Sequence, residues 1–150
     1  ILQNLLYRYF PPHDGAVNDK KFIGLHFPEV NFCEGDLDAQ MLECKLLVVD
    51  HLGTTINKAV AANIPFIGFW NFEDSPISEE ARPFFDELIE AKVLFTSASE
   101  AAIHVNKIWA NVNYWWNSEK VQLAIKSWGG RFASSSYHWR WEWFKYLWQL

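Results

Sequence analysis

Three short runs of apolar residues, separated by segments of helical pattern, constrain the fold of this chain more than any other feature. The runs cover residues 46–49, 66–70 and 93–95, and each is apolar on both faces. Strands of this kind suit the centre of a parallel sheet that helices cover on both sides. Helical segments at 54–63 and 79–91 alternate with the runs, an order typical of right-handed crossover units. We therefore expect an α/β fold, a Rossmann-like parallel sheet with helices on both faces.

Shorter elements are expected before this core. Residues 4–10 have the pattern of a strand, which ends at the two following prolines because proline cannot donate to a sheet. Residues 13–22 carry Asp, Gly and Asn turn signals and predict a loop. Residues 30–32 predict a short strand, and residues 36–44 predict a short helix with one apolar side.

The segment after the last apolar run is expected to be helical. Ser97 and Glu100 have the spacing of a capping box. A stripe at helical period follows, formed by Ala101, Val105, Ile108, Trp109, Val112 and Trp116. A helix over 118–127 is predicted to break at the Gly129–Gly130 pair. The tail, 137–150, predicts a Trp-rich helix with two apolar sides, which favours burial against two surfaces, one of them able to lie outside this chain.

Length and composition bound the organisation and exclude some partners. A chain of 150 residues, half of them hydrophobic, suits one folded domain. We expect a single lobe over 1–150, with an α/β core at 1–96 and a helical part at 97–150. The formal net charge of −5 disfavours nucleic acid, because a phosphate backbone needs a basic footprint. Nine tryptophans favour core and interface packing; composition alone does not support a sugar-stacking platform.

The remaining global features favour a cytoplasmic protein. Cys33 and Cys44 form no CxxC pair, which is typical of reduced thiols inside the cell. No apolar stretch is long enough to span a membrane, and no signal-peptide pattern is present. The chain begins at Ile1 and opens on an apolar run, so we interpret it as a piece of a longer protein.

The loop at residues 50–55 has the composition of an anion site. Ligands of open parallel sheets bind beyond the carboxyl ends of the strands, and a helix start offers unpaired N–H groups and partial positive charge. Gly53 lets the backbone approach a ligand, and Thr54 and Thr55 add hydroxyl donors. The alternative is an ordinary helix cap and tight turn. The loop has neither the GxxxxGK[ST] pattern nor GxGxxG.

The residues that follow this loop resemble a known motif. The stretch "TINKAVAANIP" (55–65) is similar to the nucleotide-sugar motif of the C-terminal domain of GT-B glycosyltransferases, which matches at Thr55, Ala59, Ile64 and Pro65. The likeness extends over most of residues 4–150. It is carried by "YRYFPPHDG", "TTINKAVAANIPFIGFWN", "ARPFFDEL" and "NKIWANVNYWWNSEKVQ", which resemble a family of bacterial surface-polysaccharide transferases with relatives that transfer Kdo-type sugars.

This resemblance implies a C-terminal donor-binding lobe, with the N-terminal lobe of the enzyme absent from the chain. Gly53, Thr54 and Thr55 would hold the donor phosphates. Arg8 is placed to add a guanidinium, whose planar fork suits phosphate. His13 and Asp14 would line the same cleft.

Two residues depart from the GT-B pattern. Lys58 stands where many of these enzymes have a Glu that holds the donor ribose, and lysine has no acceptor. Either the ribose is held elsewhere, Lys58 pairs with phosphate, or this chain binds poorly. Asn63 replaces a glycine, a mild change because asparagine tolerates the left-handed conformation.

Several other polar residues carry open alternatives. His51 could donate to a phosphate or a sugar hydroxyl, and an exposed histidine without a role fits equally well. Asp50 could take part in a site or cap the turn. Asn71 is expected to contact the donor, whereas the acidic loop 72–83 is interpreted as solvated rather than as a lid. The five histidines show no metal-ligand spacing, so no metal site is expected.

Together these features predict the donor-binding lobe of a glycosyltransferase in bacterial cell-envelope polysaccharide synthesis. Its partners would be a nucleotide sugar, with CMP or UDP favoured, a polysaccharide or glycolipid acceptor, and the missing lobe, with no further cofactor. No catalytic base or nucleophile is identified. The alternatives are a non-catalytic nucleotide- or carbohydrate-binding assembly module and a nucleotide-sugar epimerase lobe. The expected location is cytoplasmic, with a peripheral position at the inner membrane face as the alternative.

Overall fold

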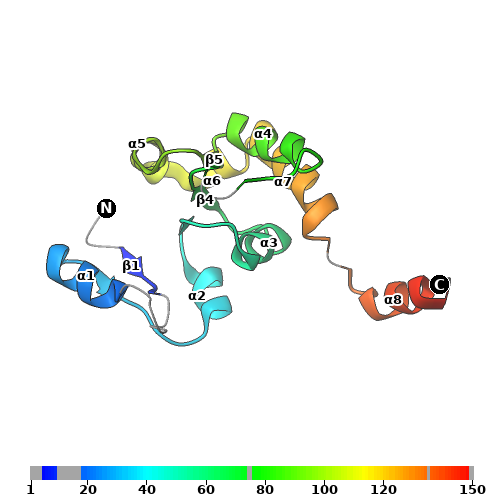
Figure 1. The fold of residues 1–150 in the computed structure, drawn as a ribbon, viewed down its shortest axis with the longest axis horizontal. Coiled ribbons are helices and arrows are strands. Elements are labelled where there is room, and N and C mark those ends of the chain that lie inside the picture. Colours follow the sequence, from blue (N-terminus) through cyan, green and yellow to red (C-terminus); the bar gives the residue numbers. More distant parts are fainter. Residues whose placement is uncertain (1–4, 10–17, 74–75, 135, 149–150) are drawn as a thin grey trace. The chain divides into compact units, whose positions relative to one another are not determined.

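The computed structural model divides the chain into two compact units, Ile1–Leu42 and Glu43–Leu150. Figure 1 shows helices and short strands following one another along both units. The structure describes residues 5–9, 18–73, 76–134 and 136–148. Each unit contains a small parallel sheet with helices, which confirms the α/β class.

The first unit is built on a two-stranded parallel sheet. Strand β1 (Leu6–Tyr7) pairs with β2 (Asn31–Phe32), so both predicted strands are present but shorter than expected. Phe32 meets the edges of Tyr7 and Tyr9, with ring centroids 6.2 Å apart in both pairs. Helix α2 (Leu37–Glu43) forms within the predicted segment.

Helix α1 (Asp19–His26) corrects the prediction of a loop over residues 13–22. Its first turn lies inside that segment, and residues 13–17 of the segment lie outside the described part of the chain. The Asn18 side chain accepts a hydrogen bond from the Lys21 amide at 2.9 Å. Asn18 and Asp19 are therefore a helix cap and a first-turn acid, two roles that share residue types with turns.

The second unit is built on a three-stranded parallel sheet in the order β3-β4-β5. The strands are β3 (Leu47–Val49), β4 (Phe66–Phe69) and β5 (Leu94–Phe95), joined by α3 (Thr54–Ala61) and α4 (Arg82–Glu90). All three predicted apolar runs and both crossover helices are confirmed, with ends that differ from the prediction by at most three residues.

Helices cover both faces of this sheet because successive residues of β4 point to opposite sides. Ile67 lies in a buried cluster with Phe95 of β5, Ala101 and Ile108 of helix α5 (Ala98–Ile108), and Val112. On the other side, Trp70, just past β4, meets Phe85 of α4 edge to face at 5.8 Å. The core of the unit therefore lies on both sides of the sheet.

The predicted apolar stripe runs through three consecutive elements rather than one helix. Helix α5 is followed by a 3₁₀ turn, η2 (Trp109–Asn111), and by α6 (Val112–Trp116). The N-terminal cap is confirmed, since Ser97 Oγ accepts from the Glu100 amide at 3.5 Å. Of the stripe, Ala101, Ile108, Val112 and Trp116 are buried.

Helix α7 (Glu119–Phe132) corrects the prediction that Gly129 and Gly130 end it. A Cβ atom at Gly129 would lie 3.3 Å from Val60 Cγ1 on α3, so the absent side chain lets the two helices approach closely. The neighbouring Trp128 is buried and donates from Nε1 to Asn57 Oδ1 of α3 at 3.0 Å. The glycine is a helix-packing residue here and not a helix terminus.

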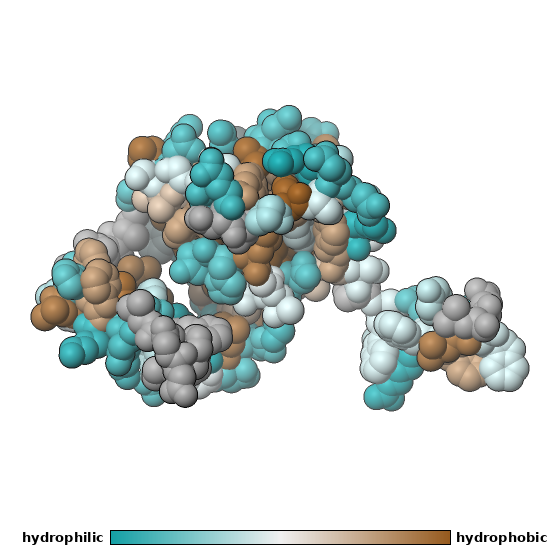
Figure 2. Space-filling view, in the orientation of Figure 1, coloured by the Kyte–Doolittle hydropathy of each residue, from teal (hydrophilic) through white to brown (hydrophobic). Residues whose placement is uncertain are grey.

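The predicted tail helix is confirmed as α8 (Trp139–Trp148), and none of its residues is buried. Its aromatic side chains stay more than half exposed, with Trp148 at 81%. The predicted burial against two surfaces is therefore not present in this chain. Figure 2 shows brown, apolar side chains at the surface of this helix. No helix among the described residues combines the length and apolar character needed to cross a membrane.

Candidate functional site

The residues that follow β3, β4 and β5 lie at one edge of the second unit's sheet. Val49 pairs with Gly68, and Phe69 pairs with Phe95, so the carboxyl ends of the three strands are nearly level. In open parallel sheets this edge is where ligands bind. The loop from Asp50 to Gly53, the residues after Trp70, and the start of α5 therefore surround a single edge.

The loop after β3 holds an ordered His–Asp pair. His51 Nδ1 lies 2.9 Å from Asp50 Oδ1, and both side chains are exposed. Because an ionised carboxylate only accepts hydrogen bonds, Nδ1 carries the proton in this bond. The other ring nitrogen, Nε2, does not take part in it. A Cβ atom at Gly53 would lie 3.0 Å from that Nε2. The imidazole therefore lies close against Gly53, beside the first turn of α3.

The first turn of α3 is open at its N-terminus. Gly53 is the N-cap residue and provides no side-chain cap, and the turn contains no acidic residue. Ile56 donates its amide to Gly53 O at 3.2 Å. Thr54 is exposed and Thr55 is half-buried. The amides and hydroxyls of these threonines, with the positive end of the helix dipole, form an environment suited to an anion.

Helix α5 begins at the same edge but closes its own N-terminus. Ser97 Oγ accepts from the Glu100 amide, and Glu100 places a carboxylate in the first turn. Both features offset the positive end of a helix. Sequence reasoning identified Ser97 as a cap and missed it as a neighbour of the site. Its position directly after the third apolar run is the signal that could have placed it there.

The residues after β4 add an amide and a buried indole. Asn71 is exposed, and its Oδ1 accepts from the Glu73 amide at 3.1 Å, so its side-chain NH₂ group is the part that can donate to a ligand. Trp70 is buried, and its Nε1 has no hydrogen-bond partner within the described residues. A buried polar group without a partner is rare, and Trp70 was not singled out from the sequence.

Arg8 belongs to the first unit and is bonded there. Its Nη1 donates to Gln40 Oε1 and its Nη2 donates to Gly35 O, each at 2.9 Å. Gln40 Nε2 in turn donates to Glu34 O at 2.6 Å. The guanidinium therefore links the end of β1 to α2, while its remaining N–H groups stay available as donors.

The other predicted site residues have simpler positions. Lys58 is exposed on α3, one turn after Thr54. His13 and Asp14 lie outside the described residues. Gly53, Thr54 and Thr55 are brought together with Asp50 and His51 in the second unit, whereas Arg8 is in the first.

Clear pKa shifts occur at His104 in the second unit and at Glu34 in the first. Burial lowers the pKa of His104, with Lys107 and Lys92 adding to the effect, and the ring lies between Phe95 and Trp115. In the first unit, the hydrogen bond with Lys20 lowers the pKa of Glu34. Among the described residues, no group of three or more His, Cys, Asp or Glu side chains could hold a metal ion.

Comparison with known proteins identifies the family. The model of the LIC12162 family transferase matches residues 1–147, and the chain therefore belongs to this family of transferases. No curated protein and no solved structure matches the chain.

Proposed function

We propose that this chain is the nucleotide-sugar-binding lobe of a glycosyltransferase that acts in bacterial cell-envelope polysaccharide synthesis. The observation that carries the proposal is the open first turn of α3, placed at the carboxyl edge of a parallel sheet in a transferase-family chain. A group-transfer enzyme needs a place for an activated donor, and nucleotide sugars are activated by phosphates. A helix start without a cap or an acidic residue supports a phosphate there.

In this proposal the donor phosphates lie over the start of α3. The Thr54 and Thr55 amides and hydroxyls donate to the phosphate oxygens, and Gly53 leaves room for their approach. Lys58, one turn further along α3, adds positive charge. Arg8 lies in the first unit, where it is bonded to Gln40 and Gly35, and its contact with a donor phosphate stays a prediction from the resemblance.

The nucleoside and sugar portions contact the flanking loops. Asp50 accepts from ribose or sugar hydroxyls, and the bond from His51 Nδ1 leaves Nε2 facing the phosphate side. The Asn71 amide donates to the same ligand. His13 and Asp14 lie outside the described residues, and their contact with the donor stays a prediction from the resemblance. The proposed ligand is a CMP- or UDP-linked sugar.

The chemical contribution of these residues is charge stabilisation. Transfer of the sugar breaks its bond to phosphate and leaves negative charge on the departing nucleotide. Fixed N–H donors and cationic side chains stabilise that charge without reorganising during the step. The base that activates the acceptor is not among the proposed residues.

Calorimetric titration of the full 150-residue chain with CMP, UDP, GDP and ADP tests the proposal. We expect one pyrimidine nucleotide to bind, and Thr55→Val to weaken it about tenfold, the effect of one lost hydrogen bond to a charged group. Ser97→Ala, at the neighbouring helix start, should bind like the unmodified chain. A folded chain that binds none of the four nucleotides would contradict the proposal.

A further inference from the structure

We infer that α8 and the two serines before it form a binding site for a neutral oligosaccharide. The site is a shallow hollow of about 730 Å³ lined by Ser134, Ser136, Trp139, Glu142, Trp143 and Tyr146. These residues lie far along the chain from the sheet edge described above. We call this set the α8 hollow.

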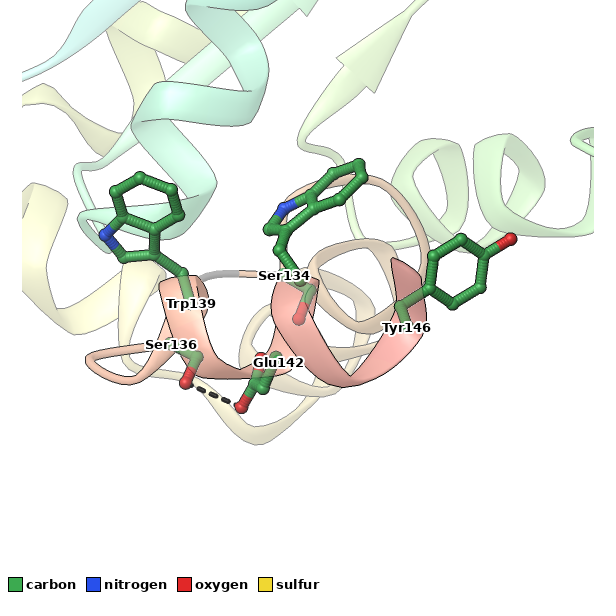
Figure 3. A pocket seen from close by; sticks show the side chains of 6 residues that line it. Ser134, Ser136, Trp139, Glu142 and Tyr146 are labelled. Atoms are coloured by element: carbon green, nitrogen blue, oxygen red, sulfur yellow. Dashed lines mark hydrogen bonds between the residues drawn. The ribbon is translucent and has the colours of Figure 1, made fainter. Parts of the chain in front are cut away.

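The aromatic part of the α8 hollow comes from one side of the helix. Trp139, Trp143 and Tyr146 follow one another at intervals of four and three residues, which places them along one face. All three side chains are more than half exposed. Figure 3 shows the rings of Trp139 and Tyr146 standing on either side of the polar groups. The length of this row suits a chain of sugars better than a single ring.

The opposite side of α8 uses its rings differently. Trp141 stacks on Phe144 with centroids 5.4 Å apart and planes 11° apart, and Phe144 stacks on Trp148 at 5.7 Å. A cation lies over one ring on each side: Lys145 is 5.6 Å from the Trp141 centroid, and Arg140 is 5.2 Å from the Trp139 centroid in the hollow. In the hollow, Trp143 and Tyr146 stand nearly perpendicular, at 80°. That arrangement leaves the broad face of at least one ring open to a ligand.

The polar groups of the hollow include an ordered acceptor, the Glu142 carboxylate, beside hydroxyl and indole groups that can donate. Ser136 Oγ donates to Glu142 Oε1 at 2.8 Å, as the dashed line in Figure 3 shows. The same oxygen accepts from the His138 amide at 3.1 Å. The ionised carboxylate has acceptor capacity beyond this bond, and Ser134 adds a hydroxyl. Hydroxyl-rich ligands supply the donors that these acceptors need.

An oligosaccharide matches both halves of this lining. The C–H faces of sugar rings are apolar and pack on aromatic faces, while their hydroxyls donate at the ring edges. A purely apolar partner would leave the Glu142 carboxylate desolvated, at a cost. Glu142 is the charged side chain of the lining itself, and it repels a carboxylated sugar placed directly against it, so neutral units are favoured at that position. The identification of this oligosaccharide as the acceptor of the transfer rests on the proposed function. The binding of an oligosaccharide to the α8 hollow does not depend on the proposed function.

Fluorescence polarisation of dye-labelled maltohexaose and chitohexaose with the full chain tests the inference, with competition by the unlabelled sugars. We expect at least one of them to bind, and Trp143→Ala to weaken binding by about tenfold through lost stacking. Trp141→Ala is the matched control on the opposite face and should stay within about twofold. Glu142→Gln should weaken the neutral sugar and strengthen binding of a hexagalacturonate probe. Because no α8 residue is buried, these variants should keep the unfolding midpoint of the parent chain.

Several results would overturn the inference. These are the absence of binding by both neutral hexasaccharides, an equal loss in Trp141→Ala and Trp143→Ala, or preference of the unmodified chain for hexagalacturonate. Cosedimentation with phosphatidylglycerol vesicles that is lost in Trp143→Ala, without oligosaccharide binding, would assign the helix to a membrane surface instead. Nucleotide titration of Trp143→Ala separates this inference from the proposed function, since we expect nucleotide affinity to be unchanged.

Discussion

Helices α3 and α5 begin at the same edge of one parallel sheet, but their first turns differ. Helix α5 starts at Ser97, whose hydroxyl accepts from the Glu100 amide, and it carries an acid in its first turn. Helix α3 starts at Gly53, with neither a side-chain cap nor an acid. Both caps are extended in backbone conformation, so the difference lies in the side chains. Because one helix start is closed and the other is open, we expect an anion to bind at α3 rather than at α5.

The two helices are also held by different contacts. Helix α5 contributes Ala101 and Ile108 to the cluster around Ile67. Helix α3 is tied to α7, by the hydrogen bond from Trp128 to Asn57 and by the close approach of Val60 to Gly129. Variants can therefore disturb one helix start without directly touching the other.

The largest expected effect comes from Trp128→Ala, which removes the side chain that holds α3. Trp128 is 5% exposed, contacts Phe85 and donates to Asn57. We expect a loss of about 3–5 kcal/mol in the free energy of unfolding, typical of a buried tryptophan replaced by alanine. Urea denaturation followed by far-UV circular dichroism measures it. Trp128→Phe keeps most of the ring packing and should cost clearly less; an equal loss would show that packing is not the cause.

Ser97→Ala should have the next largest effect and should act on α5. The variant leaves the Glu100 amide without its side-chain acceptor, so we expect a loss of about 1 kcal/mol in stability. The same denaturation experiment measures it. Ser97→Asp is the control, because aspartate also accepts from the first turn. If Ser97→Ala were as stable as the parent chain, the cap would not stabilise α5.

Gly53→Ser gives α3 a serine N-cap like the one at the start of α5. Serine exceeds glycine as a cap by only a few tenths of a kcal/mol, and its Cβ must displace the tip of His51 slightly. We therefore expect nearly unchanged stability together with weaker nucleotide binding, because the new hydroxyl takes a first-turn amide. Calorimetry on the variant checks both. Nucleotide binding at the parent affinity would show that this amide is not used.

The smallest expected effect concerns pH and the packing of α5. Burial lowers the pKa of His104 from its ordinary value of 6.5, so the folded state favours the neutral ring. Between the lowered folded-state pKa and 6.5 the unfolded chain binds more protons than the folded chain, so stability falls as the pH decreases across this window and levels off below the folded-state pKa. Unfolding midpoints between pH 8 and pH 5 measure this slope. In His104→Phe the slope should be shallower; an unchanged slope would exclude His104 as its source.

The sheet of the second unit was predictable from sequence because its signal is local and strong. The apolar runs at β3, β4 and β5 are bounded by polar segments, so the local sequence pattern is enough to predict these three strands. Two segments were assigned wrongly from the sequence, the end of α7 because of a distant contact and the start of α1 because of an ambiguous local signal. Gly129 is helical because α3 lies against it, and nothing next to it in the sequence records that approach. Asn18 and Asp19 were interpreted as a turn because the same residues also begin helices.

The residue types of the candidate site could be predicted from the sequence, but the contacts between them could not. Gly53, Thr54 and Thr55 were recognised because a strand followed by glycine and hydroxyl residues precedes a helix. Three features became visible only in the structure. They are the His51–Asp50 bond, the hydrogen bond from the Glu100 amide to Ser97 Oγ, and the unpartnered Nε1 of the buried Trp70 among the described residues. Arg8 was chosen for its charge, and its bonds to Gln40 and Gly35 join residues far apart in sequence.

The most direct test of the central claim is an amide chemical-shift titration of the ¹⁵N-labelled chain with the nucleotide that binds it in calorimetry. If α3 is the phosphate site, the Thr54, Thr55 and Ile56 amides shift together, at the same ligand concentration as Gly53. The amides at the start of α5 should stay in place, because Ser97 already occupies that turn. Shifts confined to α5, or to neither helix start, would contradict the account.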